Sequence, residues 1–146
     1  MKKLKLFSFK KPLFFKFLNK EKQITLHLKS IETKEIYPIN AKLGDCLLDA
    51  INESGIRDVS CFGICDKQLA CHSCSVNILT KYNKLQTPSQ NELDVLYELG
   101  NKYKDNSTRM SCQVILSEEM ENMLIEIPRN ELFFNNNNSK ENEEEN

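Results

Sequence analysis

Hydrophobic and polar residues alternate with a period of two over QITLHLKS, residues 23–30, and less regularly over EIYPIN, residues 35–40. Such alternation is typical of half-buried strands, and the short polar turn between the two segments predicts a β-hairpin. Pro38 lacks the N–H group that an interior strand must donate. We therefore expect the second strand to lie at a sheet edge or to end there.

The pattern changes to a helical spacing over GDCLLDAINESG, residues 44–55. Asp45 is suited to cap the N-terminus of this helix, and Gly55 is suited to end it. The apolar residues that share one face of the predicted helix are Cys46, Leu47, Ala50 and Ile51.

A second helix is predicted over SQNELDVLYELG, residues 89–100, directly after a proline. Ser89 and Glu92 have the spacing of a capping box, and Gly100 marks the end of the helix. We expect its buried face to consist of Leu93, Leu96 and Tyr97.

Three more strands are predicted, over SVNIL (75–79), RMSCQVIL (109–116) and LIEIP (124–128), with one helical turn before the last of them. Residues 55–74 show no sustained period, and long irregular loops in compact domains are usually functional. The chain is therefore predicted to be one α+β domain with a sheet of four or five strands.

Charge divides the chain into three parts. Residues 1–20 contain seven of the 20 basic residues and none of the 21 acidic ones, so the remainder has a formal charge of −8. The basic, Leu- and Phe-rich segment 1–20 has the composition of an organelle transit peptide. Residues 21–130 form the predicted domain, and the Asn- and Glu-rich segment 131–146 is predicted to be disordered.

The same composition excludes two classes of function. A nucleic-acid-binding domain needs clustered Lys and Arg, and no basic stripe follows residue 20. No apolar run approaches the roughly 18 residues that a membrane span requires. We expect neither nucleic acid nor a membrane span.

Six cysteines are present, and four of them have an informative spacing. Cys65, Cys71 and Cys74 form a C-x5-C-x2-C pattern, and Cys112 follows after 37 intervening residues. A two-iron, two-sulfide cluster needs four thiolates, three of which can come from one loop and the fourth from a distant strand. The alternative is a zinc site of Cys61, Cys65, Cys71 and Cys74, which leaves Cys112 unexplained.

The segments GICDKQLACHSC, LDVLYEL and RMSCQVIL resemble the cluster loop, the acidic helix and the fourth-ligand strand of the adrenodoxin-type, or mitochondrial, 2Fe-2S ferredoxins. GDCLLDA and ENMLIEIPR also match that pattern, so the resemblance covers residues 23–129. Plant-type ferredoxins use C-x4-C-x2-C, which is one residue shorter.

The resemblance implies a β-grasp fold and a one-electron carrier that is not an enzyme. It implies four ligands to a 2Fe-2S cluster, namely Cys65, Cys71, Cys74 and Cys112. Cys46 and Cys61 fall outside the motif, and for Cys46 we expect a buried apolar role. Lys67 stands where the family usually has glycine, so we expect either a different local shape of the loop or a left-handed backbone at Lys67. Its ammonium would also lie near the cluster and raise the reduction potential.

The resemblance also implies partners. In the family, acidic residues of the second helix bind an NAD(P)H-dependent ferredoxin reductase; here that face contains Asp94, Glu98 and Asn91, where Asn91 replaces a usual acid. The expected electron acceptor is the iron–sulfur cluster assembly machinery, with a mitochondrial cytochrome P450 as the alternative. We expect a monomer in the mitochondrial matrix or in a mitochondrion-related organelle.

Overall fold

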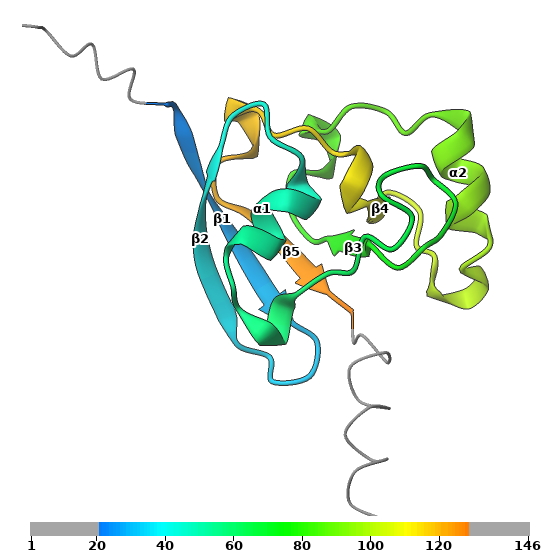
Figure 1. Cartoon of the computed structure of the whole chain (residues 1–146), viewed down its shortest axis with the longest axis horizontal. Helices are drawn as coiled ribbons and strands as arrows, with labels where there is room; N and C mark the ends of the chain where they lie inside the picture. The colour runs from blue at the N-terminus through cyan, green and yellow to red at the C-terminus, as the bar shows by residue number, and fades with distance from the viewer. Residues whose placement is uncertain (1–20, 129–146) are drawn as a thin grey trace, which may run out of the picture.

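The computed structural model describes residues 21–128, which form a five-stranded mixed sheet with two main helices (Figure 1). The predictions for segments 1–20 and 131–146 lie outside the described residues. Within residues 21–128, no helix is both long enough and apolar enough to cross a membrane.

The strands are β1 (Gln23–Ser30), β2 (Ile36–Lys42), β3 (Ser75–Ile78), β4 (Thr108–Met110) and β5 (Met123–Ile127), and their order in the sheet is β2-β1-β5-β3-β4. β1 pairs antiparallel with β2 and parallel with β5. β3 pairs antiparallel with both β4 and β5. The predicted hairpin and the mixed five-stranded sheet are confirmed.

Period-two alternation is realised in the two central strands. Every second side chain of β1 is buried, including Leu26 and Leu28, and β5 repeats this pattern. β2 is an edge strand, as expected for the strand that contains Pro38, which lies opposite His27.

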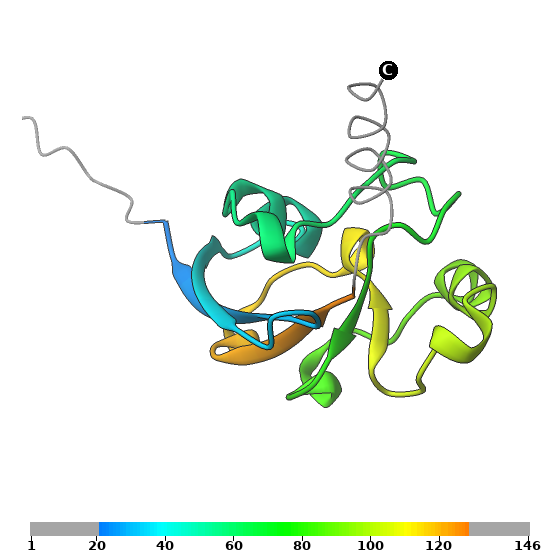
Figure 2. The ribbon, with the colours of Figure 1, turned by 90° about the horizontal axis from the view of Figure 1, so that it is seen from below.

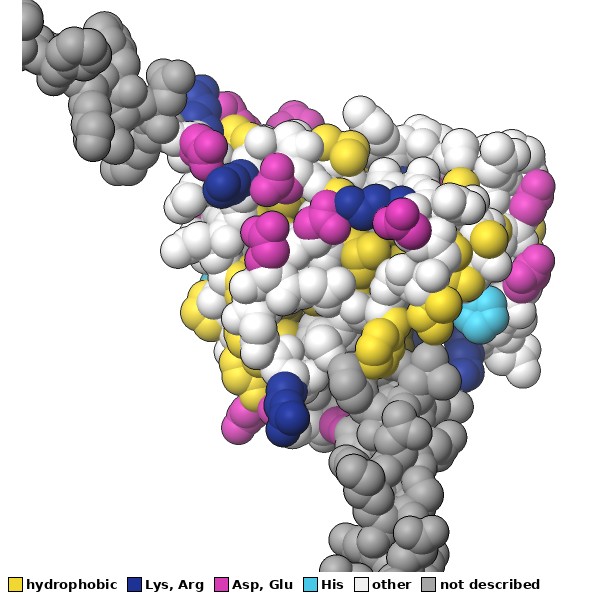
Figure 3. Space-filling view, viewed as in Figure 1, with side chains coloured by type: hydrophobic (Ala, Val, Ile, Leu, Met, Phe, Trp, Pro, Cys, Tyr) yellow, Lys and Arg dark blue, Asp and Glu magenta, His cyan; other side chains and the backbone are white. Residues whose placement is uncertain are grey.

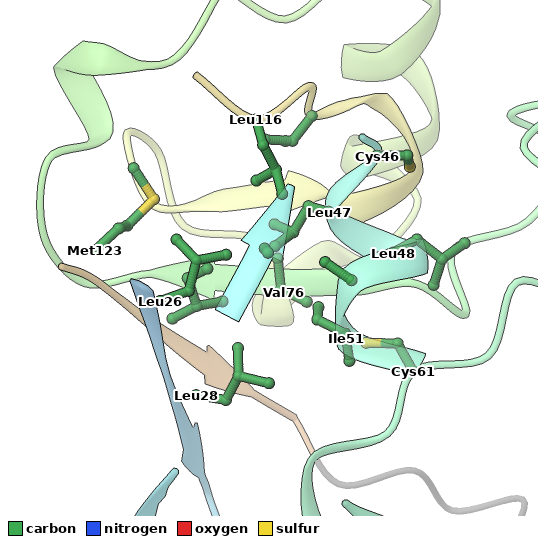
Figure 4. Packing of buried hydrophobic residues seen from close by; sticks show 14 of the residues in the cluster. Leu26, Leu28, Cys46, Leu47, Leu48, Ile51, Cys61, Val76, Leu116 and Met123 are labelled. Carbon is green, nitrogen blue, oxygen red and sulfur yellow. The ribbon is translucent and has the colours of Figure 1, made fainter. Parts of the chain in front are cut away.

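Helix α1 (Leu47–Glu53) covers one face of the sheet (Figure 2). Its residues Leu47 and Ile51 are fully buried and pack with strand residues such as Leu26, Leu28 and Val76 (Figure 4). The predicted buried face of this helix is confirmed.

The predicted cap of α1 is wrong. The N-cap residue is Cys46 in place of Asp45, and its side chain makes no capping bond. Cys46 forms an isolated β-bridge with Ile115, and the N–H group of Leu47 donates to the Val114 carbonyl at 2.8 Å. A neighbouring backbone segment therefore satisfies the first helical N–H group, and no side-chain cap is needed.

Helix α2 (Gln90–Tyr97) begins as predicted, because Ser89 is the N-cap and its hydroxyl accepts a bond from the Glu92 N–H group at 3.2 Å. Glu92 does not complete the capping box, since its carboxylate is buried against Arg109. Tyr97 was expected in the buried face but is 57% exposed, whereas Leu96 is fully buried.

Candidate metal centre

The loop between α1 and β3 contains three of the predicted ligands and lies between α1 and α2 in both views (Figures 1 and 2). It includes one short 3-10 turn, η1 (Arg57–Val59), and is otherwise irregular. Three non-glycine residues between the first two cysteines, Asp66, Lys67 and Leu69, have positive φ angles. A backbone in this conformation turns its N–H groups in directions that no helix or strand permits.

The loop lies directly against α1 at Gly63. A Cβ atom added there would come within 2.6 Å of the Leu48 side chain, well inside van der Waals contact. A larger residue at this position would have to displace the end of the Leu48 side chain.

The fourth predicted ligand reaches the site through strand pairing. Ser75 of β3 pairs with Met110 of β4, and the N–H group of Ser111 donates to the Cys74 carbonyl at 3.0 Å. The Ser111 hydroxyl donates to the same carbonyl at 2.7 Å. These bonds bring together Cys74 and Cys112, which are separated by 37 residues in the sequence.

Cys112 itself does not lie in a strand, which corrects the prediction. β4 ends at Met110, and Cys112 lies in the 3-10 turn η4 (Ser111–Gln113). The turn diverts the chain from the sheet and directs this cysteine toward the loop.

The four predicted ligands form two pairs. Cys65 and Cys71 are within hydrogen-bonding reach of each other, as are Cys74 and Cys112. Cys74 and Cys112 are buried, whereas Cys65 and Cys71 are partly exposed. Among residues 21–128, no three His, Cys, Asp or Glu side chains converge on a point that would hold a single metal ion.

In each pair, one thiol has a lowered pKa and therefore loses its proton more readily. The hydrogen bond from Cys74 lowers the pKa of the Cys112 thiol to about 6, against the effect of burial. The same contact, together with burial, raises the pKa of Cys74. In the outer pair, burial acts to raise the pKa of Cys71, but hydrogen bonds from Ser73 and Cys65 outweigh it and lower the pKa. Metal binding needs thiolates, so these cysteines would release their protons to the solvent on binding.

Cys46 and Cys61 are outside the group. The Cys46 thiol is buried and donates to the Ser111 and Cys112 carbonyls, each at 3.4 Å, as expected for a packed, non-ligating residue. Cys61 lies beside Ile51 in the hydrophobic core (Figure 4), where burial raises the pKa of its thiol to about 12. The structure pairs Cys112 with Cys74, whereas the hydrogen-bond partner of the Cys61 thiol is Ser111.

Sequence reasoning missed two polar residues of the site. The Ser73 hydroxyl lies 3.1 Å from the Cys71 sulfur and donates to the Phe62 carbonyl at 2.9 Å. The Gln113 amide lies 3.4 Å from the Cys112 sulfur. In the sequence, Ser73 and Gln113 each lie next to a predicted ligand. That position alone does not show whether a side chain points toward the sulfur.

Of the two alternatives that we expected, Lys67 has the left-handed backbone, with a φ angle of 64°. Its ammonium nitrogen, however, lies 2.5 Å from a carboxylate oxygen of Asp49 on α1. The charge of Lys67 is thus paired with α1 in this structure.

The predicted docking residues Asn91, Asp94 and Glu98 are all exposed, with the spacing of one helical face. Figure 3 shows acidic side chains at the rim of the molecule over α2. Tyr97 adds an exposed ring to the same helix and packs edge-on against Tyr103, with 5.3 Å between ring centroids.

Comparison with known proteins identifies the class of fold. The structure resembles that of a ferredoxin from Rhodopseudomonas palustris, with a TM-score of 0.64, 23% identity, and coverage of 72% of this chain and 96% of the other. Putidaredoxin in a covalent complex with putidaredoxin reductase also matches, with a TM-score of 0.61 and 22% identity over 70% of this chain and 96% of that one. The fold is therefore that of the 2Fe-2S ferredoxins.

The sequence comparison identifies the family. Sheep adrenodoxin (Ovis aries) is 35% identical over 95 residues, covering 64% of this chain and 72% of the relative. Rat mitochondrial adrenodoxin (Rattus norvegicus) is 31% identical over 112 residues, covering 74% of this chain. The chain spans 56% of the length of that rat relative. No model of a protein family matches the chain. On the strength of these relatives, the chain belongs to the adrenodoxin family.

Proposed function

We propose that this protein is a one-electron carrier that holds a 2Fe-2S cluster through Cys65, Cys71, Cys74 and Cys112. The observation that carries the proposal is the arrangement of these four thiols as two pairs, one pair from the loop and the other joining the loop to η4. In a 2Fe-2S cluster each iron binds two cysteine thiolates besides the two bridging sulfides. Two thiol pairs therefore match two irons.

The cluster, when bound, supplies a one-electron redox couple and no acid–base chemistry, so we propose a carrier and not an enzyme. The chain's own residues set the environment of the thiols. Cys74 and Cys112 lie in the protein interior, and Cys65 and Cys71 lie nearer the surface. This asymmetry gives the site a protected side and a side through which an electron can pass to a docked partner.

The partner that we propose as donor is an NAD(P)H-dependent ferredoxin reductase, bound at the α2 face formed by Asp94, Glu98 and Asn91. Putidaredoxin, a protein of the same fold, has been solved in complex with its reductase. Acidic side chains on an exposed helix favour a basic partner and rapid, salt-sensitive association. Such weak contact suits a protein that must bind a donor and an acceptor in turn.

We propose that the acceptor is the iron–sulfur cluster assembly machinery, and that the protein works as a monomer in the mitochondrion or a related organelle. The relatives are named mitochondrial, which supports this location. The alternative acceptor is a mitochondrial cytochrome P450. Offering the reduced protein to an assembly complex and to a P450 under the same conditions distinguishes the two, because the physiological acceptor will oxidise it faster.

The cluster itself is tested on the purified native protein. We expect two irons and two sulfides per chain, visible absorption that bleaches on reduction, and an EPR signal from the reduced state. One metal ion per chain without inorganic sulfide would overturn the proposal and favour the zinc site. Mass spectrometry of the same sample gives the metal content and the mature N-terminus together.

A further inference from the structure

The side-chain amide of Gln113 bridges two parts of the candidate site. Its Nε2 atom donates to the Lys67 carbonyl at 3.2 Å and to the Cys112 sulfur at 3.4 Å. Lys67 belongs to the ligand loop, and Cys112 to the turn η4 that follows β4. One amide group thus joins the loop to the ligand that is most distant from it in sequence.

The two acceptors determine how the amide is oriented. A carbonyl oxygen and a thiolate sulfur can only accept hydrogen bonds, so the NH₂ end of the amide must face them. The two N–H bonds of that group suffice for the two partners. Reversing the amide would set its oxygen against two acceptors, which is unfavourable.

Lys67 is held on its other side as well. Its ammonium forms an ion pair with Asp49 of α1, while its carbonyl accepts from Gln113. The ion pair is about 40% exposed on both side chains, so on its own it contributes little to stability. The amide bridge is the contact that acts on a ligand atom directly.

A hydrogen bond to a ligand sulfur matters most when the sulfur is most negative. Adding one electron to a site of four thiolates increases the negative charge on the sulfurs, and a fixed N–H donor stabilises the reduced state more than the oxidised state. The donor therefore raises the reduction potential. It also restrains the loop against η4, because its bond to the Lys67 carbonyl must break before the loop can move away.

We propose that Gln113 is a positioning residue of this site, which clamps the ligand loop to Cys112 and raises the reduction potential. This inference rests on the proposed 2Fe-2S function for the potential, but the clamp does not depend on which metal the thiols hold.

The experiment compares Gln113→Leu, which has a similar volume but no donor, with Gln113→Glu, which keeps the shape and replaces the donor by a carboxylate. Gln68→Leu is the matched control, because Gln68 is an exposed residue of the same loop and lies between Cys65 and Cys71. Each protein is assayed as purified, with its metal. Two quantities are measured: the midpoint potential, and the rate of amide hydrogen exchange in residues 65–74.

We expect Gln113→Leu to retain its iron and sulfide, to have a lower midpoint potential than the native protein, and to exchange about fivefold faster in the loop, since one hydrogen bond contributes on the order of 1 kcal/mol. Gln113→Glu should lower the potential further through its charge. Gln68→Leu should match the native protein in both measurements.

Native potential and native exchange rates in both Gln113 variants would overturn the inference. If Gln113→Leu fails to fold, Gln113→Glu still tests it, because its shape is nearly native. If the native protein proves to hold a single metal ion without sulfide, the proposed function fails, but faster loop exchange in the Gln113 variants would still support the clamp and unchanged exchange would refute it.

Discussion

At the scale of single residues, the environment of each thiol separates six chemically identical cysteines into two groups. Four lie in pairs at the loop and the turn η4, where contacts with neighbouring thiols and hydroxyls polarise them. Two are packed in the core, where burial favours the neutral thiol. Composition alone does not make this distinction, because it depends on neighbours that are distant in sequence.

Replacement of Cys112 tests the assignment of the fourth ligand. We expect Cys112→Ser to lose the visible spectrum, because an alcohol is a poor substitute for a thiolate on iron, and Cys46→Ser to keep it. Absorption spectra and iron content of the two purified variants provide the measurement. Cys46→Ser is a close control, since the Cys46 sulfur lies within 3.4 Å of the Cys112 carbonyl oxygen. A native spectrum for Cys112→Ser would mean that another residue provides the fourth ligand.

Alkylation of Cys61 tests its place in the core. Burial raises the pKa of this thiol to about 12 from its ordinary value of 9.0. Because only the thiolate reacts, the folded protein near pH 8 should alkylate at Cys61 roughly 1,000-fold more slowly than the urea-denatured protein, before any steric protection is counted. Mass spectrometry of the labelled peptide follows the reaction. Equal rates in the folded and denatured states would place Cys61 at the surface.

At the scale of secondary-structure elements, a buried ion pair joins α2 to β4. The Arg109 guanidinium donates to both carboxylate oxygens of Glu92, at 2.8 and 3.0 Å, and to the Gln86 carbonyl at 2.7 Å. The Met110 N–H group donates to the same Glu92 carboxylate at 3.0 Å. This network fixes the helix that we propose as the docking surface to the strand that leads to Cys112.

Removing one partner of this pair should destabilise the fold strongly. Glu92 and Arg109 are each only 2% exposed, so Glu92→Leu leaves an uncompensated buried charge, at a cost of about 3–5 kcal/mol in the free energy of unfolding. Urea denaturation followed by circular dichroism measures the loss. The double variant Glu92→Leu/Arg109→Met should recover much of it, because no charge remains buried. If the two single losses simply add in the double variant, the pair is not coupled.

At the scale of the whole molecule, the fold sets the thiol site between two helices with different surroundings. The loop packs on α1 at Gly63, while η4 connects to β4 and, through Glu92, to α2. An exposed acidic helix therefore lies near the site without contributing a predicted ligand. Electrostatic attraction at α2 can guide a basic partner toward the partly exposed thiols.

Charge reversal on α2 tests docking. Asp94→Lys should slow reduction by the ferredoxin reductase several-fold at low ionic strength, and the difference should shrink as salt is added, because exposed charges are screened. Stopped-flow absorbance follows the reaction. Glu53→Lys is the matched control, since it reverses an exposed acid on α1 and leaves α2 unchanged. An unchanged rate for Asp94→Lys at low salt would exclude this face as the docking site.

Several elements of the fold were predictable because the hydrophobic pattern and the turn and cap residues indicate the same secondary structure. Alternation in β1, the proline in the edge strand and the serine cap of α2 depend on neighbours a few residues away, and all three predictions are confirmed. The errors have a common cause. The Leu47 N–H group donates to the Val114 carbonyl, so α1 does not use Asp45 as its cap, and the Glu92 carboxylate accepts from Arg109 in place of completing the capping box. Both partners lie outside the local segment that the pattern describes.

The spacing of the cysteines and the irregular loop could be read from the sequence, because both depend on residues close together in the chain. The class of protein came from the resemblance of several segments to a known family. Only the tertiary structure decided that Cys74 meets Cys112, that Cys61 is buried in the core and that Gln113 reaches a ligand sulfur. These outcomes follow from the pairing of β3 with β4 and from the packing of the loop on α1. Both are contacts between segments that no local pattern relates.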